Sequence, residues 1–171
     1  HVDFENADPV MSVPHLLGLR ELDIEYLGPY PHGELWFNEA LMAMHGEKVS
    51  GKSGGTVQKV LKDAKVSVIV GHIHRFELFA QSNFYSSGMK DVMALSPGTI
   101  AHLDGRVPAF SPRMNWQQGL GDVWYEPDGT LFHINPIRIQ YHEGTALYEG
   151  KVFVGYDPIA DIRKEKQWAG L

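Results

Sequence analysis

The stretch VSVIVGHIHRF, residues 66–76, decides how the rest of the sequence is interpreted. Its first five residues form a short apolar run rich in β-branched side chains, which predicts a buried and central strand. The run ends abruptly in Gly71-His72-Ile73-His74. Two histidines at positions i and i+2 converge on one site if the chain turns there. We attribute that turn to Gly71, because glycine adopts backbone conformations that other residues avoid.

The histidine pair is a candidate metal site. Imidazole nitrogen is a ligand for Mn, Fe, Ni or Zn, and the end of a buried strand is a rigid place to mount it. His72 and His74 are therefore candidate ligands. The alternative for an isolated His-x-His pair is an ordinary pair of hydrogen-bonded histidines at the end of a strand.

A further histidine follows an apolar strand upstream. The segments GELWFN (33–38) and ALMAMHG (40–46) predict two joined strands, and the second one runs into His45. A glycine-serine loop follows, and residues 56–64 carry apolar side chains at helical spacing. A loop and a helix therefore connect the strand before His45 to the strand before His72, which makes His45 the third candidate ligand.

Many strands and few helices are expected, which predicts an α+β fold with sheets covered by helices. A turn signal, Pro127-Asp128-Gly129, separates two alternating runs and predicts a hairpin over residues 119–139. Capping residues predict helices. The other expected elements are a short helix at 12–22, a helix at 157–168, and strands at 24–28, 76–81, 92–95 and 99–105.

Residues 46–53 contain G-x-x-x-x-G-K-S, the letter pattern of a phosphate-binding P-loop. A P-loop NTPase also needs a second apolar strand that ends in an acidic residue, whereas the strand at 66–70 ends in Gly71 and His72. Gly54 and Gly55 are also poor residues for a first helical turn. A P-loop nucleotide binder stays open as an alternative function, and the simpler interpretation is an active-site loop that matches by coincidence.

The order of these motifs resembles the C-terminal half of the calcineurin-like metallophosphoesterases. The late motifs of that family are a histidine after a strand, then G-H-x-H, then an (N/S)-P-G-(S/T) loop. They correspond here to His45-Gly46, Gly71-His72-Ile73-His74 and Ser96-Pro97-Gly98-Thr99. The resemblance covers most of residues 35–135, and the tract at 115–129 is similar to phage and actinobacterial members. It implies part of a four-layer α/β/β/α sandwich, mostly its strand-rich C-terminal half.

The resemblance also implies an activity. Members of the family hydrolyse phosphomono- or phosphodiesters with a metal-bridged hydroxide. Their substrates include nucleotides, nucleic-acid ends, cyclic nucleotides and phosphoproteins, and all four classes stay open here. His45 and His72 resemble the histidines that bind the second metal, and His74 resembles the one that binds the first. The implied cofactors are two divalent ions, Mn in the first place, with Fe, Zn and Ni as alternatives. Such ions clamp a phosphate oxygen and lower the pKa of the water between them.

The early motifs of the family, D-x-H, G-D-x-x-D and G-N-H-(D/E), do not occur in this sequence. They supply the bridging Asp and the leaving-group His, so no catalytic residue is assigned. We expect the chain to begin just after them, with a lead-in at 1–34, a motif-bearing core at 35–135, and a hairpin and tail at 136–171. Alone it is expected to be inactive, and to bind itself or the missing N-terminal half. The alternative is a non-catalytic module that binds metal or is completed by a partner chain.

Composition sets outer limits. The 171 residues have a net charge of −6 and no cysteine. The charge argues against a protein that coats duplex nucleic acid, and the lack of thiols excludes thiolate metal sites and disulfides. No apolar stretch approaches the roughly 20 residues that span a bilayer, so we expect no membrane partner and a cytoplasmic location, the host cytoplasm if the gene is a phage gene. Arg75 is expected at an exposed strand position, with contact to a substrate phosphate as the alternative. Trp116 and Trp124 are expected as core or sheet-face aromatics, with base-stacking platforms as the alternative.

Overall fold

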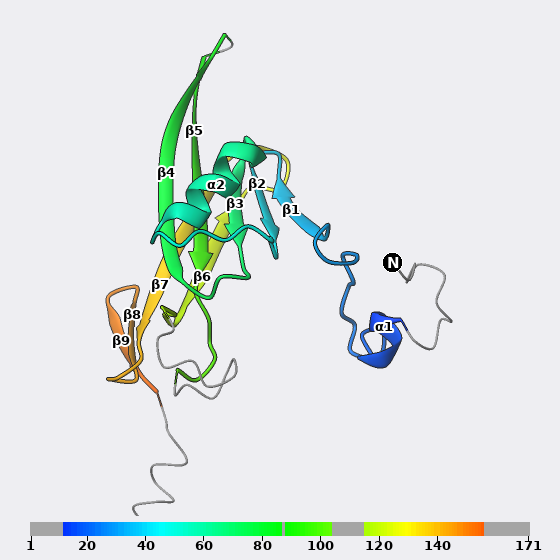
Figure 1. The fold of residues 1–171 in the computed structure, drawn as a ribbon, viewed down its shortest axis with the longest axis vertical. Coiled ribbons are helices and arrows are strands. Elements are labelled where there is room, and N and C mark those ends of the chain that lie inside the picture. The colour runs from blue at the N-terminus through cyan, green and yellow to red at the C-terminus, as the bar shows by residue number, and fades with distance from the viewer. Residues whose placement is uncertain (1–11, 87, 104–114, 156–171) are drawn as a thin grey trace, which may run out of the picture.

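The computed structural model describes residues 12–86, 88–103 and 115–155 (Figure 1). In this part of the chain, nine strands arranged in two sheets outweigh two helices, which confirms a strand-rich α+β fold. The elements are α1 (Val13–Leu16), β1 (Glu34–Asn38), β2 (Leu41–Met44), α2 (Gly55–Ala64), β3 (Ser67–Val70), β4 (Phe76–Tyr85), β5 (Gly88–Pro97), β6 (Gly119–Tyr125), β7 (Phe132–Gln140), β8 (Thr145–Tyr148) and β9 (Lys151–Val154).

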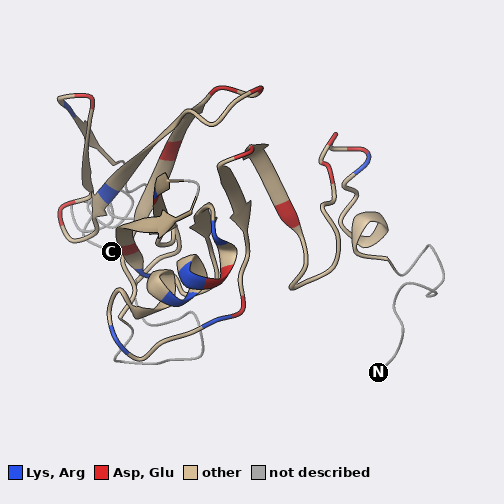
Figure 2. Ribbon diagram, turned by 90° about the horizontal axis from the view of Figure 1, so that it is seen from above, with Lys and Arg blue, Asp and Glu red and all other residues tan. Residues whose placement is uncertain are grey.

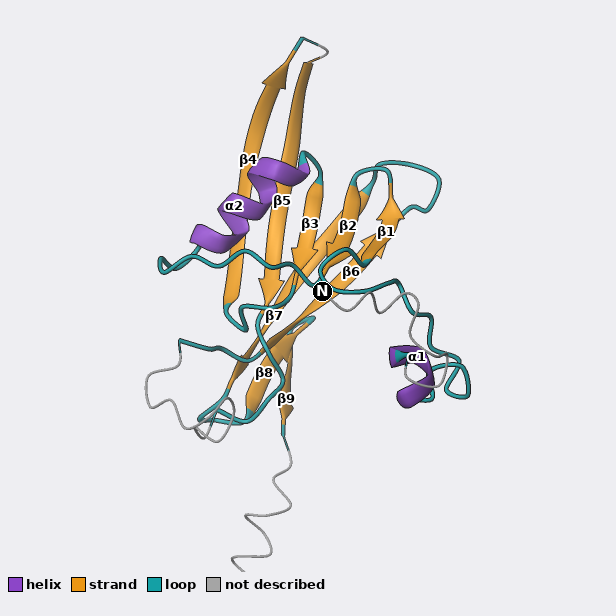
Figure 3. Cartoon of the chain, turned by 45° about the vertical axis from the view of Figure 1, so that its right-hand side comes forward, coloured by secondary structure: helices purple, strands orange, loops and turns teal. Residues whose placement is uncertain are grey.

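The first sheet has the strand order β1-β2-β3-β5-β4. Its three central strands, β2, β3 and β5, are parallel, and the two outer strands run antiparallel to them. Met44 lies opposite Val70, and Ile69 lies opposite Leu95. The carboxyl ends of the three parallel strands therefore meet at one edge of the sheet (Figure 3).

The central strands of this first sheet are covered on both faces. Leu41 packs in a buried cluster with Leu95 and with Ile134 of the second sheet, whereas the adjacent Met42 packs against α2. Successive side chains of a strand point to opposite faces, so a strand covered on both sides needs a continuous apolar run. The helix-side cluster consists of Met42, Val57, Val60, Leu61, Val68, Val70, Val92 and Ala94. The described layers are α2, the first sheet and the second sheet, in that order.

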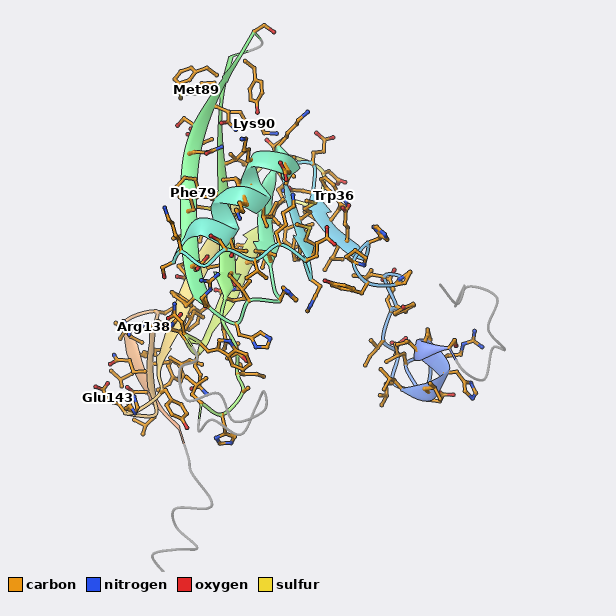
Figure 4. The ribbon with its side chains drawn as sticks, viewed as in Figure 1. Trp36, Phe79, Met89, Lys90, Arg138 and Glu143 are labelled. Carbon is orange, nitrogen blue, oxygen red and sulfur yellow. The ribbon has the colours of Figure 1, made fainter. Side chains whose placement is uncertain are left out.

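The second sheet is an antiparallel meander with the order β6-β7-β8-β9. Val123 and Ile134 lie opposite each other and face the first sheet. The neighbouring Trp124 points the other way and is 63% exposed. Figure 4 labels Arg138 on β7 and Glu143 in the turn that follows, on the part of this sheet away from α2. Only one face of the second sheet is therefore buried by described residues.

Several sequence-based expectations are wrong. The expected helix at 12–22 is only the four-residue α1, which buries no residue. Residues 24–28 form no strand. Both elements were expected from apolar residues, most of which stay exposed here: Leu16 and Leu17 are 61% and 62% exposed, and Ile24 is 51% exposed. The expected helix at 157–168 lies outside the described residues.

The chain after β5 also differs from expectation. The expected strand at 99–105 is absent over the described residues 99–103, where Thr99 makes a single bridge to Gln118. The backbone takes a left-handed turn at Gly98, with φ of +85°, which directs it away from the ladder of β5. The predicted hairpin at 119–139 is confirmed as β6 and β7.

Surface charges are mixed in sign. Figure 2 shows basic residues along α2 and acidic residues spread over the strands and turns. Neither of the two described helices is long and apolar enough to cross a bilayer.

Candidate metal centre at the carboxyl edge of the first sheet

Three strand ends converge on one edge of the first sheet. The backbone N–H of Gly71, just after β3, donates to the carbonyl of Met44, the last residue of β2, at 3.2 Å. His45 follows β2 directly, and His72 follows β3 after Gly71. The third parallel strand, β5, ends at Pro97 on the same edge. The predicted placement of His45 beside the Gly71–His74 turn is therefore found.

The rings of His45 and His72 lie side by side. Nε2 of His45 is 3.2 Å from Nδ1 of His72, and the ring planes are inclined by 74°. Two imidazole nitrogens bound to one tetrahedral ion at the usual 2.0–2.1 Å lie about 3.3 Å apart. The spacing therefore fits two ligands of one metal ion, and in the absence of metal it fits a hydrogen bond between the rings.

His74 follows two residues after His72, and it is partly buried. Its Nδ1 is buried and has no hydrogen-bond partner among the described residues. Burial lowers the pKa of His74, and the nearby His72 and His45 lower it further. A lowered pKa favours the neutral imidazole, whose free nitrogen lone pair is what a metal requires.

The described side chains do not by themselves form a metal site with three protein ligands. Among residues 12–86, 88–103 and 115–155, no group of three His, Asp or Glu side chains is close enough to hold a metal ion together. The structure thus brings His45 and His72 into contact. His74 lies near enough that their charges lower its pKa. In the described part of the chain, no carboxylate stands with these histidines to offset the charge of a second cation.

The turn that carries the histidines differs from the expected one. Left-handed backbone angles occur at His72, with φ of +66°, and at His74, with φ of +56°, and not at Gly71. Such angles are uncommon in residues other than glycine and cost about 1–2 kcal/mol each. The intervening Ile73 is 7% exposed and anchors the turn, and its N–H donates to the carbonyl of Gly71 at 2.8 Å. Packing therefore holds both histidines in a strained conformation, as is common at functional sites.

Gly46 is the glycine that this edge requires. Its φ is +79°, and a Cβ at this position would lie 2.5 Å from Cγ2 of Val70. The chain can leave β2 past the end of β3 only without a side chain there. This explains in physical terms why glycine follows His45.

Gln117 links the histidine turn to the Ser96–Thr99 loop. Its backbone N–H donates to the carbonyl of His74 at 3.1 Å, and its carbonyl accepts from the N–H of Thr99 at 3.0 Å. Its side-chain Oε1 accepts from the N–H of Phe76 at 3.1 Å. Sequence reasoning missed Gln117, since no local pattern shows that a residue 43 positions after His74 (117 minus 74) returns to it.

Arg75 corrects another expectation, because it is buried and not exposed. It is 7% exposed, and its Nη2 donates to the carbonyl of Ser50 and to Oγ1 of Thr56, both at 2.8 Å. Its Nε lies 3.3 Å from Oε1 of Glu77, an ion pair without an aligned hydrogen bond. Arg75 therefore ties the loop after His45 to the first turn of α2.

Part of the loop at 46–53 is closed by its own hydrogen bonds. A P-loop needs backbone N–H groups that are free to face a phosphate. Here the N–H of Ser50 donates to Oγ1 of Thr56 at 3.0 Å, and the N–H of Lys52 donates to Oγ of Ser50 at 3.3 Å. The N–H of Gly55 donates to the carbonyl of Lys52 at 3.0 Å. These donors are taken up by the loop and by the first turn of α2, which argues against the P-loop alternative.

Two aromatic residues border the histidines. The ring centroid of Tyr30 lies 5.4 Å from that of His45 and 6.4 Å from that of His72. The ring of Trp116 lies 4.2 Å from that of His74, at an interplanar angle of 76°. Tyr30 was not found from the sequence, and Trp116 was expected as a core or sheet-face aromatic, with base stacking as the alternative. The tyrosine belongs to the lead-in, so this segment contributes to the wall of the site.

Comparisons with protein-family models, curated proteins and solved structures find no match to this chain. The functional interpretation therefore rests on the motifs and on the geometry of the carboxyl edge.

Proposed function

We propose that this edge is the metal-binding part of a metallophosphoesterase, which hydrolyses a phosphate ester. The observation that carries the proposal is the 3.2 Å separation of His45 Nε2 and His72 Nδ1 at the ends of adjacent parallel strands. The order of layers, one helix and two sheets, is in keeping with part of the four-layer sandwich of that family. The Ser96–Thr99 loop leaves the same edge, and Gln117 ties it to His74.

The chain's residues fit one ion better than two. A divalent ion held there would supply Lewis acidity and a water of lowered pKa. Two cations a few ångströms apart repel each other strongly, and three neutral histidines offer no negative charge against this repulsion. We propose that His45 and His72 hold one ion, with His74 kept neutral beside them. Carboxylate ligands for a second ion, and the acid for the leaving group, come from outside the described residues.

A non-catalytic module that binds metal, or that a partner chain completes, is the second candidate. The observation that favours it is the lack of a third ligand close to the His45–His72 pair in the described part of the chain. The two candidates share the metal site and differ in hydrolysis, so one set of experiments separates them.

Calorimetric titration of the chain with Mn²⁺, Zn²⁺ or Co²⁺ tests the metal site. One ion per chain is expected to bind, and His45→Ala or His72→Ala is expected to abolish this binding. His133→Ala is the matched control, since His133 is an exposed strand histidine of the second sheet. No binding by the unmodified chain, or equal loss in all three variants, overturns the proposal.

Hydrolysis of an aryl phosphodiester in the presence of Mn²⁺ separates the two candidates. The chain alone is expected to show negligible turnover, because the acid for the leaving group is not among its described residues. General acid catalysis is typically worth about a hundredfold to ten-thousandfold in rate. Turnover is expected once a segment with the D-x-H and G-N-H-(D/E) motifs accompanies it. Turnover by the chain alone that His72→Ala abolishes would show that the site is complete. Metal binding without turnover in either preparation favours the non-catalytic module.

A further inference from the structure

A cavity of about 290 Å³ adjoins the histidine pair. It shares His72 with the candidate metal centre, and the loop after β2, the histidine turn and the segment before β6 form its walls. Its other lining residues are Val49, Ser50, Ile73, Arg75, Asn115 and Trp116. We call this space the Trp116 cavity. Its volume is near the lower end of the range for small-molecule sites, which are usually apolar with a few placed polar groups.

The walls of the Trp116 cavity suit a flat ring. Trp116 contacts His74 in a T-shaped arrangement, which occupies at most one face of the indole. The indole is half-buried and lines the cavity together with the apolar side chains of Val49 and Ile73. A base that stacks on an aromatic side chain gains about 1–3 kcal/mol.

The rim of the cavity offers hydrogen-bond donors. Oδ1 of Asn115 accepts from Nε2 of Gln117 at 2.8 Å, which orients the amide and leaves its NH₂ group to donate. Oγ of Ser50 accepts from the N–H of Lys52 at 3.3 Å, so its hydroxyl hydrogen is also available. Ring nitrogens and carbonyl oxygens of nucleobases are the acceptors that such donors recognise.

The Trp116 cavity offers no free cation to bind a phosphate group among its described lining residues. Arg75 also lines this space, but its guanidinium is directed to the carbonyl of Ser50, to Thr56 and to Glu77. A cation whose donors are used in this way is not free to pair with an anion. The chemistry of the walls therefore favours a neutral, planar, heteroaromatic group.

We propose that the Trp116 cavity binds the nucleobase of a nucleotide substrate, with the base stacked on Trp116 and the phosphate directed to His45 and His72. The position of the phosphate rests on the proposed metal centre. The binding of the base does not, because neither Trp116 nor Asn115 is a candidate ligand. Trp116 is thus a specificity residue for nucleotides over other phosphate esters.

The test measures binding of adenosine, thymidine and ribose to the chain in EDTA by calorimetry or NMR titration. Both nucleosides are expected to bind, and ribose is not. Trp116→Leu is expected to weaken nucleoside binding roughly tenfold or more, and Trp116→Phe, which keeps an aromatic face, only a fewfold. Trp124→Leu is the matched control, since Trp124 is 63% exposed on the outer face of the second sheet.

A second variant separates this proposal from the metal centre. His45→Ala is expected to lose metal binding and to keep nucleoside affinity, because His45 does not line the cavity. Circular dichroism verifies that each variant is folded, and Trp116→Phe tests stacking if Trp116→Leu does not fold. Equal affinity of the unmodified chain for ribose and nucleosides, or equal losses in the Trp116→Leu and Trp124→Leu variants, overturns the assignment.

Discussion

The two sheets of this molecule differ in how they are covered. In the first sheet, Leu41 and Leu95 are 0% exposed on one face, and Val68 and Ala94 are 0% exposed on the other. In the second sheet, outward-facing side chains such as Trp124 remain well exposed. The candidate site lies at the edge of the sheet that is packed on both faces. Such a sheet holds strand ends in fixed register, so histidines from different strands can meet.

The second sheet contributes to the site mainly where its first strand begins. Gln117, just before β6, bonds to both the histidine turn and Thr99. Farther along this sheet, β8 and β9 are held by pairing with their sequence neighbours. The site should therefore be sensitive to changes in the first sheet and at this junction, and tolerant of changes on the outer face of the second sheet.

Leu95→Ala is expected to have the largest effect. Leu95 is 0% exposed and packs with Leu41 and Ile134 between the sheets, and truncation of such a side chain costs about 2–5 kcal/mol. Leu120→Ala in the second sheet, where the side chain is 47% exposed, is the matched control and should cost under about 1 kcal/mol. Urea denaturation measures both free energies of unfolding. Similar losses would mean that the outer face of the second sheet is covered in solution.

Gly98→Ala is expected to cause the next largest loss in the free energy of unfolding. Gly98 has a φ of +85°, and a Cβ there would overlap the carbonyl oxygen of Gln117. Gly150 in the β8–β9 turn has a similar φ of +72°, but a Cβ there meets nothing within 4 Å. Backbone strain acts in both variants, so Gly150→Ala should cost about 1 kcal/mol. Gly98→Ala should cost about 2–4 kcal/mol, because the clash adds to the strain.

The same denaturation experiment compares the two glycine variants directly. If both variants lose the same free energy of unfolding, the backbone at Gly98 and Gln117 can move apart easily. In that case Gln117 does not fix the histidine turn.

Much of the first sheet could be predicted from the sequence, because its signals are local. The apolar runs before His45 and His72, and the helical spacing at 56–64, correctly indicated β2, β3 and α2. The pairing of His45 with His72 followed from the order of the motifs, since two parallel strands joined by a helix bring their carboxyl ends together.

The errors concern residues whose state depends on distant parts of the chain. Arg75 is buried only because the loop at 50–56 folds back over it, and its neighbours gave no sign of this. Residues 24–28 have the composition of a strand, but no neighbouring strand lies beside them in the described structure. Patterns of side chains predict which segments can form elements, whereas burial and pairing depend on the tertiary fold.

Arg75→Lys tests the hydrogen bonds that tie the loop after His45 to α2. Lysine cannot reproduce the two hydrogen bonds from Nη2 to Ser50 and Thr56, so a loss of about 1–2 kcal/mol is expected. The loop at 46–53 should also become more sensitive to limited proteolysis. Arg138→Lys in β7 is the matched control, because Arg138 is exposed. An unchanged cleavage pattern in Arg75→Lys would show that the loop is held by other contacts.

Tyr148→Phe in the second sheet is expected to have the smallest effect on stability and a clear effect on titration. The hydroxyl of Tyr148 donates to Oδ2 of Asp122 at 2.5 Å, and Nε1 of Trp124 donates to the same oxygen at 3.0 Å. The bond from Tyr148 is the main cause that lowers the pKa of Asp122, with Trp124 second. In return, Asp122 raises the pKa of Tyr148 to about 12.

The two shifts act at opposite ends of the pH range. The folded chain disfavours protonation of Asp122, so that contribution to stability is present above pH 3.8 and is lost as the pH falls through the lowered pKa. The folded chain retains the Tyr148 proton, so that contribution is present below pH 10.0 and is lost as the pH rises to about 12. In Tyr148→Phe, carboxylate NMR should show a higher pKa for Asp122, and absorbance should show the loss of the tyrosine that titrates near pH 12. Tyr125→Phe, in the same sheet, should leave the Asp122 titration unchanged. If Asp122 titrates alike in both variants, the hydroxyl of Tyr148 does not bind it in solution, and the second sheet lacks even this local polar contact.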